Sequence, residues 1–356
     1  MGALHVHFTF VDLELDRCKM DNQSISEYKE IPSFYNEMYS TFEKNKWAYL
    51  VIDSTEGQDF LNGAEIDKIA ARSKQLRKIS KPFRTALNNN EIPWCVVCVP
   101  GPNWAKKVLG EARTTEDMWN LISPILKLDK NNPCVEWDKE THNFHVRMQY
   151  LNSLGIKSLH YTSEMTNLTV GFHEDAYWVG GPSQLPNGDT FYANLPTYEI
   201  FSAPDITKCS GFFTSTKPVS VLGEATEGVK FVLEKGKIVS FDAKKGESAI
   251  RKLLNTDEGS RQIGEIALVD ESNPIAQSGK IFSSILYDEN ASCHIAIGSC
   301  YPECFKNLGD NSVQSKNGNI SDVHVDFMIG SKSLKIEATC SDGSVVTLIN
   351  NGNYTF

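Results

Sequence analysis

The chain has 356 residues, of which 40% are hydrophobic and 22% charged, an ordinary globular composition long enough for two domains. Its formal net charge of -10 argues against a general nucleic-acid binder, which needs clustered Lys and Arg, and against docking on an anionic membrane. No stretch approaches the ~18 consecutive apolar residues of a membrane span. The nine cysteines follow no framework spacing, which indicates free thiols in a reducing compartment and a cytoplasmic protein.

The first part of the chain, residues 1–140, alternates strand and helix patterns. This alternation predicts an α/β N-terminal domain with an open, largely parallel sheet. Strands are expected where apolar residues alternate or cluster, at Leu4–Phe10, Trp47–Ile52 and Trp94–Val99. Helices are expected at residues 34–42, at Ala64–Lys78 and at Thr115–Leu126, the last capped by Thr114 or Thr115.

A polar segment at residues 132–154 predicts a connecting helix, and we place the domain boundary near it. The remainder, residues 141–356, is richer in strand patterns and predicts an α+β C-terminal domain. Within it, VKFVLEKGKIVSF predicts a hairpin with Lys-Gly at the turn, followed by a helix through Ile250–Leu254. The tail from His324 onward predicts a meander of strands separated by Gly-marked turns.

The C-terminal half carries a series of acids and histidines in segments apolar enough to be core: Glu199, Glu265, Glu289, His294, His324 and Asp326. Buried carboxylates are costly unless they are paired or bound to a metal. Taken singly, each residue also fits a solvated or salt-bridged surface position. The combination of all six is what indicates a dinuclear metal centre.

Two local patterns support this interpretation. His324 and Asp326 are two apart in a predicted strand, so their side chains share a face and can reach one metal. Glu265 interrupts the apolar strand GEIALV, and His294 is expected in the first turns of a helix predicted over ASCHIAIGSCY. Four carboxylates balance the charge of two divalent ions, and mixed oxygen and nitrogen ligands favour Zn, Co or Mn over Ca.

Cysteines offer an alternative metal site. Cys293, His294, Cys300 and Cys304 could form a structural zinc site, which would compete for His294 and leave the acids unexplained. Cys95 and Cys98 resemble a CxxC pair, but in a strand a spacing of three places the two thiols on opposite faces. We interpret both as buried apolar cysteines.

Several ordered segments between Asn167 and the C-terminus resemble the thermophilic-type family of dinuclear metallo-aminopeptidases, among them NLTVGF, YWVGG, NLPTYEIFSAPD, LYDENASCHIAIG and HVDFMIGS. The resemblance implies that the six acids and histidines hold two metal ions, with Glu265 bridging. It also matches Tyr301 to a family active-site tyrosine. Tyr301 lies two helical turns after His294 if the predicted helix persists, and its hydroxyl would donate a hydrogen bond to the tetrahedral intermediate.

The activity implied is release of N-terminal amino acids from peptides by a hydroxide activated at the two metals, in a homodimer with no nucleic-acid or membrane partner. Two departures from the family pattern stand out. Where the family shows two adjacent acids after Pro-Thr, this chain has Tyr198 followed by Glu199. The chain also begins later, so an N-terminal helix and strand region is expected to be missing. The alternatives are an inactive or structural metal-binding homologue, or a dinuclear hydrolase of another amide or ester.

Overall fold

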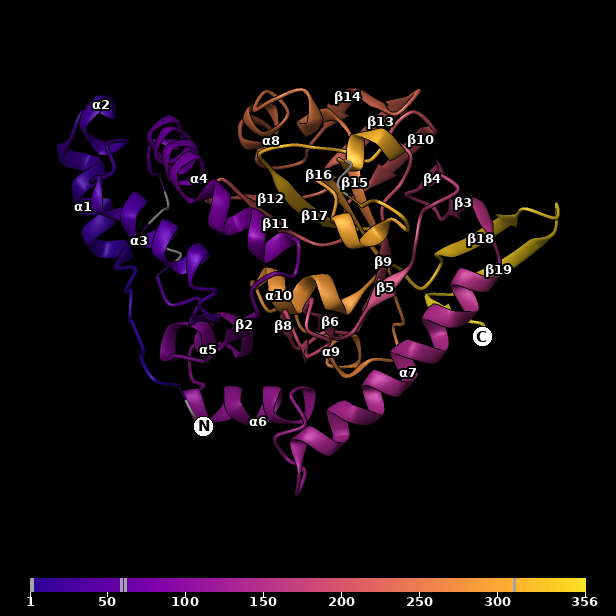
Figure 1. Cartoon of the computed structure of the whole chain (residues 1–356), viewed down its shortest axis with the longest axis horizontal. Helices are drawn as coiled ribbons and strands as arrows, with labels where there is room; N and C mark the ends of the chain where they lie inside the picture. Colours follow the sequence, from indigo (N-terminus) through magenta and orange to yellow (C-terminus); the bar gives the residue numbers. More distant parts are fainter. Residues whose placement is uncertain (1–2, 58–59, 61–62, 310–311) are drawn as a thin grey trace.

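The N-terminal half of the computed structural model combines helices with short parallel strands. The structure describes residues 3–57, 60, 63–309 and 312–356. Strands β1 (Tyr49–Asp53) and β2 (Trp94–Cys98) pair in parallel, as predicted, and β8 (Asn194–Leu195), from much later in the chain, extends the sheet in the same direction. The helices of this half, drawn from indigo to purple in Figure 1, are α1 (Leu13–Asn22), α2 (Ile25–Tyr28), α3 (Phe34–Lys44), α4 (Ile66–Asn88), α5 (Pro102–Leu109) and α6 (Thr115–Ile125).

Local sequence explains where these helices begin and pack. The Thr114 side chain accepts the backbone N–H of Asp117, and the Asp117 carboxylate accepts the N–H of Thr114, a capping box that confirms the predicted cap of α6. The aromatic side of α3 packs on α4, with Phe42 and Phe83 rings 5.9 Å apart. Helix α4 runs ten residues beyond its predicted end at Lys78, because Pro82 is accommodated inside the helix.

The predicted strand at Leu4–Phe10 is wrong. These residues form no strand and pair with none among the described residues, and Leu4 and Phe10 are 92% and 88% exposed. Alternating hydrophobicity creates an apolar face, but a strand also needs a neighbour to accept and donate its backbone hydrogen bonds.

The predicted connecting helix is confirmed as α7 (Pro133–Ser153). The Asn132 side chain caps it by accepting the N–H groups of Cys134 and Val135. In Figure 1 this helix crosses the outside of the molecule and leads into the antiparallel sheets of the second half.

The larger sheet of the C-terminal half is antiparallel, with strand order β14-β13-β10-β4-β3-β18-β19-β20. Its strands are β3 (Ile156–Thr162), β4 (Asn167–Gly171), β10 (Cys209–Thr214), β13 (Lys230–Glu234), β14 (Lys237–Asp242), β18 (Lys335–Cys340), β19 (Val345–Asn350) and β20 (Asn353–Tyr354). The pair β13–β14 is the predicted hairpin, and α8 (Glu247–Leu253) is the helix predicted after it.

The smaller sheet, of five antiparallel strands, has the order β17-β16-β15-β9-β5. Its strands are β5 (Val179–Gly180), β9 (Glu199–Ser202), β15 (Ile263–Val269), β16 (His294–Gly298) and β17 (His324–Met328). The predicted meander from His324 is therefore wrong at its first strand, because β17 pairs with β16 while β18 pairs in the other sheet. The chain crosses between the two sheets at Gly330, where a Cβ would lie 2.4 Å from the Ser292 side chain.

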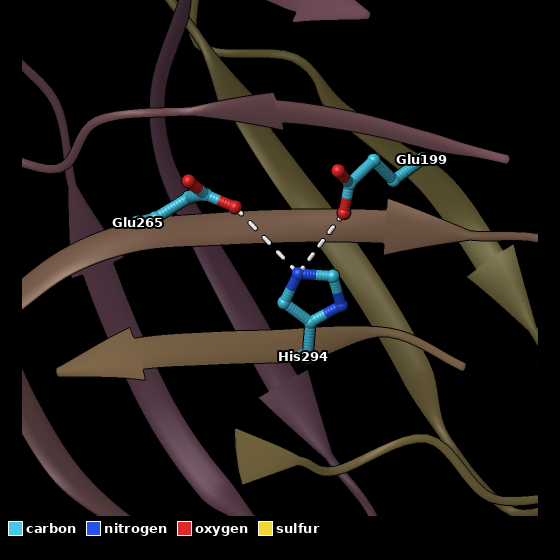
Figure 2. A group of neighbouring side chains, drawn as sticks. All are labelled: Glu199, Glu265 and His294. Atoms are coloured by element: carbon cyan, nitrogen blue, oxygen red, sulfur yellow. Dashed lines mark ion pairs between the residues drawn. The ribbon is translucent and has the colours of Figure 1, made fainter. Parts of the chain in front are cut away.

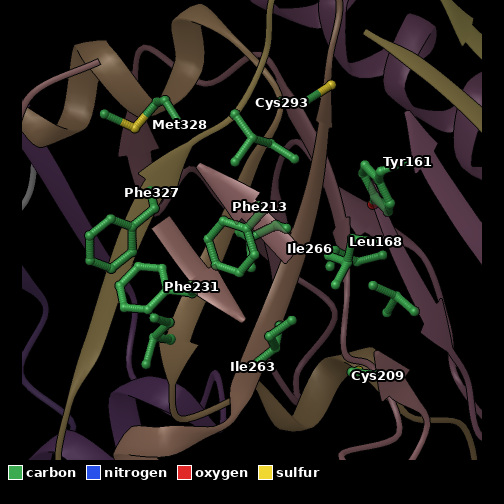
Figure 3. Close-up of a cluster of buried hydrophobic side chains, with 14 of the residues drawn as sticks. Tyr161, Leu168, Cys209, Phe213, Phe231, Ile263, Ile266, Cys293, Phe327 and Met328 are labelled. Atoms are coloured by element: carbon green, nitrogen blue, oxygen red, sulfur yellow. The ribbon is translucent and has the colours of Figure 1, made fainter. Parts of the chain in front are cut away.

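One apolar core joins the two sheets. Ile266 and Phe327 from the smaller sheet meet Leu168, Phe213 and Phe231 from the larger one, as Figure 3 shows. The Phe231 and Phe327 rings lie 4.9 Å apart in an edge-to-face contact. One face of the smaller sheet thus packs in this core, and its other face is available for a functional site.

The remaining elements are short. Two small hairpins are formed by β6 (Ser183–Gln184) with β7 (Thr190–Phe191) and by β11 (Val219–Val221) with β12 (Glu224–Thr226). Helices α9 (Pro274–Gln277) and α10 (Ile285–Asp288) lie against the N-terminal half, where the Trp104 indole N–H donates to the Phe282 carbonyl at 2.5 Å. Among the described residues, no helix is both long and apolar enough to cross a membrane.

Candidate metal centre

Strand alternation divides the smaller sheet into a core face and a site face. In β16, Ile295 and Ile297 join the apolar core, so His294 and Ala296 point to the opposite side. The same alternation operates in the neighbouring strands. The site face consequently gathers the acids and histidines of four strands: Glu199, Glu265, His294, His324 and Asp326.

Small residues between the ligand candidates leave them room. Ala296 is paired in register with Glu265 on one side and Asp326 on the other. A methyl group at this position lets both longer side chains lean across it. His324 is likewise paired with Gly298, which carries no side chain. The register therefore opens a space that is bounded by carboxylates and imidazoles.

The side-chain atoms form two close groups that share one residue. His294 Nε2 lies 3.1 Å from Glu199 Oε2 and 3.6 Å from Glu265 Oε1. Dashed lines mark these two contacts in Figure 2. His324 Nε2 lies 3.4 Å from Asp326 Oδ1 and 3.7 Å from Glu265 Oε2. Within each group the candidate ligand atoms all lie within 4.8 Å of one another. Glu265 thus offers one oxygen to each group.

Backbone carbonyls orient both histidines. Nδ1 of His294 lies 3.0 Å from the Glu289 carbonyl, and Nδ1 of His324 lies 2.7 Å from the Ser299 carbonyl. A carbonyl can only accept, so each Nδ1 carries the hydrogen and each Nε2 turns toward the carboxylates.

A neutral His294 then presents a lone pair to Glu199 Oε2, which is buried and has no hydrogen-bond partner among the described residues. Two acceptors 3.1 Å apart repel each other unless a metal ion or a proton lies between them. The donor set of carboxylate oxygens and imidazole nitrogens suits divalent Zn, Co or Mn, so the residues present fit the metal that they were predicted to hold.

Without such a cation, protons must supply the compensating charge. Burial would lower the pKa of His324, but the Asp326 and Glu265 carboxylates raise it to about 10. Burial likewise opposes the charge on His294, yet Glu199 and Glu265 raise its pKa well above the usual value. Burial itself raises the pKa of Glu265. The centre therefore holds excess buried negative charge.

Glu289 lies beside the two groups rather than inside either. It is 8% exposed, in a single-turn helix, η3 (Glu289–Ala291), that follows α10. Burial, then the charges of Asp326 and Glu199, raise its pKa well above the ordinary value, which places it within electrostatic reach of both groups. Asn290 ties this turn to the strand of Glu199, because its side chain accepts the N–H of Tyr198 at 2.6 Å.

The helix predicted through His294 and Tyr301 is wrong. HIAIG forms strand β16, because its alternating isoleucines fill the core face while smaller residues and His294 occupy the other. Tyr301 instead precedes a single-turn helix, η4 (Pro302–Cys304). The Tyr301 ring still lies 5.2 Å from the His324 ring, so the structure brings the predicted tyrosine to the centre by a different route. Burial raises the pKa of Tyr301 well above its usual value, which keeps the hydroxyl a hydrogen-bond donor.

Two other sequence interpretations are decided by side-chain direction. Tyr198 alternates with Glu199 and turns away from the centre, where its hydroxyl donates to the Ile125 carbonyl at 2.8 Å. Cys293 alternates with His294 and belongs to the apolar core, with its Sγ accepting the Val269 N–H at 3.3 Å. The alternative zinc site that combined Cys293 with His294 is therefore contradicted, since their side chains lie on opposite faces.

A cavity of about 450 Å³ opens over the centre. One wall carries the six ligand candidates and Tyr301. Another wall comes from the N-terminal half, the loop after β5 and the turn after Tyr301. It includes residues that no sequence pattern marked as part of a site: Leu87, Asn88, Asn90, Trp94, Ser183 and Glu303. Their spacing carries no recognisable signal, because they converge only when the two halves pack together.

Comparison with known proteins identifies the family of this chain. The family model described as "Thermophilic metalloprotease (M29)" matches residues 1–354. Aminopeptidase PepS of Streptococcus thermophilus is 32% identical, with 99% of this chain and 87% of the relative aligned. Aminopeptidase AmpS of Bacillus subtilis is 34% identical, with 100% of this chain and 88% of the relative aligned. The solved structure of wild-type AmpT from Thermus thermophilus superposes with a TM-score of 0.88 at 30% identity, covering 98% of this chain and 86% of that one. The chain therefore belongs to the thermophilic metalloprotease (M29) family.

Proposed function

We propose that this chain is an aminopeptidase that removes N-terminal residues from peptides with two divalent ions, Zn, Co or Mn. The observation that carries the proposal is the pair of close ligand groups that share Glu265. The relatives named as aminopeptidases support the substrate class. The residues proposed to hold the two ions are Glu199, Glu265, Glu289, His294, His324 and Asp326.

The chemistry that two such ions supply when bound is activation of a water molecule and polarisation of the scissile carbonyl. The chain contributes orientation, charge and exclusion of solvent. His294 and His324 are held by carbonyls through Nδ1, so they keep one tautomer throughout. The protonated Tyr301 hydroxyl is proposed to donate a hydrogen bond to the oxygen that becomes negative in the transition state. The cavity walls position the peptide and limit bulk water.

Metal removal and replacement test the proposal. The purified protein is treated with a chelator and then supplied with zinc, cobalt or manganese, while release of nitroaniline from leucyl p-nitroanilide is followed. We expect activity to disappear and return with the metal, with two ions bound per chain. The N-acetylated substrate serves as control and should stay intact, because the proposed enzyme needs a free amino terminus. Absence of metal-dependent release by folded, metal-loaded protein would contradict the proposal.

The assembly and cellular location are further parts of the proposal. The family resemblance leads us to expect a homodimer, the free cysteines a cytoplasmic protein, and the connecting helix α7 a division into two domains near residue 140. Analytical ultracentrifugation tests the dimer, and limited proteolysis tests the division. A monomer at micromolar concentration, or a first cleavage far from that boundary, would contradict these parts and leave the proposed chemistry in place.

A further inference from the structure

The cavity over the metal centre is acidic beyond what the metals require. Among the described residues that line it, none is Lys or Arg, while five are acids: Glu199, Glu265, Glu289, Glu303 and Asp326. Four of these belong to the proposed ligand set, and two divalent ions would cancel their four negative charges. Glu303 is the acid left over. With two divalent ions bound, the Glu303 carboxylate would therefore have no charged partner among the lining residues.

Glu303 is held in place by the facing wall. It lies in η4, two residues after Tyr301, and its Oε2 accepts the Asn90 side-chain N–H at 2.7 Å. A side-chain hydrogen bond with Ser183 supports it from the hairpin after β5. A carboxylate has about four acceptor positions, so these contacts leave capacity for a ligand. Burial raises the pKa of Glu303 and these hydrogen bonds lower it, and a cation arriving beside it would lower it further.

The turn that carries Asn90 is rigidly defined. Asn90 has a φ of 55°, in the left-handed region that Asn tolerates well, directly after the end of α4. Its backbone N–H donates to the Leu87 carbonyl at 3.0 Å, and the N–H of Glu91 donates to the Ala86 carbonyl at 2.9 Å. The Asn90 amide is therefore presented to Glu303 by a closed turn rather than by a loose loop.

Trp94 lies on the same wall as Glu303. The Trp94 side chain lines the cavity, and its indole N–H is buried without a hydrogen-bond partner among the described residues. Because this N–H is closed off from the cavity, Trp94 meets a ligand with its other atoms. The wall thus combines an anion with an aromatic side chain, a combination that suits a ligand bearing a positive charge.

We propose that Glu303 binds an ammonium group of the substrate. This inference rests on the proposed aminopeptidase function, and it makes Glu303 a substrate-binding residue. The ammonium group has two possible sources, the α-amino group of the substrate's first residue or the side chain of a basic residue. In either case Glu303 acts on binding and leaves the metals untouched.

Steady-state kinetics of Glu303→Gln test the proposal. The metal-loaded variant is compared with wild type on leucyl and lysyl p-nitroanilides. We expect KM to rise about tenfold or more with little change in kcat, because a charge-assisted contact to the substrate is lost. A rise for both substrates identifies the α-ammonium, and a rise for the lysyl substrate alone identifies the side chain. Glu91→Gln is the matched control, since it changes a neighbouring carboxylate that pairs with Lys46 outside the cavity, and its KM should stay unchanged.

A binding measurement separates this inference from the proposed function. Calorimetric titration with leucinamide and lysinamide measures affinity for the ammonium group without turnover. One outcome is that wild type has no peptidase activity but binds an amide, and that Glu303→Gln weakens this binding. That outcome would contradict the proposed function and support the ammonium site. If a folded Glu303→Gln protein with two ions per chain shows wild-type KM and wild-type amide affinity, the ammonium site is overturned. Absence of amide binding to wild type overturns it as well.

Discussion

At the scale of single residues, Glu265 differs from the other ligand candidates because both groups depend on it. Its two oxygens face different histidines, at 3.6 Å from His294 and 3.7 Å from His324. Glu265→Gln should therefore reduce metal content from two ions per chain to less than about one, because an amide is a weak ligand for both positions. Glu199→Gln touches one group only and should retain about one ion per chain. Elemental analysis after dialysis against metal-free buffer measures both values.

The matched control for these variants is Glu271→Gln. Glu271 is a partly buried glutamate whose pKa burial also raises, but it lies outside the cavity. We expect this variant to keep two ions. If Glu265→Gln bound as much metal as Glu271→Gln, the shared-ligand interpretation of the centre would fail.

Tyr301 is the residue whose effect should appear in the rate and not in metal content. Its hydroxyl stays protonated because burial raises its pKa, and its ring lies beside His324. Tyr301→Phe should lower kcat by about a hundredfold or more, since a donor to the developing negative charge is removed. Tyr150→Phe, which changes a tyrosine stacked on Phe356 away from the cavity, should leave kcat unchanged. An unaltered kcat in metal-loaded Tyr301→Phe would remove Tyr301 from the mechanism.

At the scale of elements, strand register determines whether the ligands can converge. Ala296 lies between Glu265 and Asp326, and it is fully buried. Ala296→Val would place two more carbon atoms where the carboxylates lean together, so we expect weakened metal binding in a folded protein. Overpacking of a core typically costs about 1–3 kcal/mol, so stability should fall as well.

Ala338→Val is the control that separates the loss of ligand space from the loss of stability that overpacking causes by itself. Ala338 is equally buried, in β18 of the larger sheet, and packs in the apolar core. It should lose a similar amount of stability in urea denaturation while keeping its metal affinity. Equal metal affinity in the two variants would show that Ala296 does not hold open the ligand space.

Elements with strong local signals could be predicted from the sequence. The capping box of Thr114 marks the start of α6, and the Lys-Gly turn marks the β13–β14 hairpin, because each signal resides in a few adjacent residues. His324 and Asp326 were assigned to one face correctly for the same reason, since alternation along a strand is local.

Errors arose where the outcome depends on distant partners. The segment at Leu4–Phe10 alternates like a strand but has no described neighbour to pair with. HIAIG fits a helix as well as a strand, because a short apolar run carries no decisive period, and only its place between β15 and β17 makes it a strand. No local pattern marks Glu303, because its partner, Asn90, is 213 residues away.

At the scale of the whole molecule, the two faces of the five-stranded sheet have different roles. One face is fixed by apolar packing on the larger sheet, and the other collects charges that would be unstable if buried alone. The N-terminal half completes the cavity by covering the charged face from the other side. Stability and metal binding are consequently coupled, because the same burial that shapes the cavity makes uncompensated charge costly.

This coupling predicts how stability depends on pH. In the metal-free protein the pKa of His324 is raised from 6.5 to about 10, so the folded state holds this proton more tightly than the unfolded state. The resulting stabilisation is complete below pH 6.5 and is lost as pH rises toward about 10. Metal ions replace the proton and bind better as pH rises, so the difference between loaded and metal-free protein should widen over the same range.

Thermal unfolding with chelator or with zinc, across this pH range, measures the effect. We expect the metal-free midpoint to fall by several degrees as pH rises, and the zinc-loaded midpoint to fall much less. His324→Asn should make the metal-free slope shallower, because one of the protons that link folding to pH is gone while that of His294 remains. His145→Asn, on the outer surface of α7, should keep the slope of wild type. A metal-free midpoint that stays level, or rises, between pH 6.5 and about 10 would show that the buried carboxylates are compensated by something other than protons on the histidines.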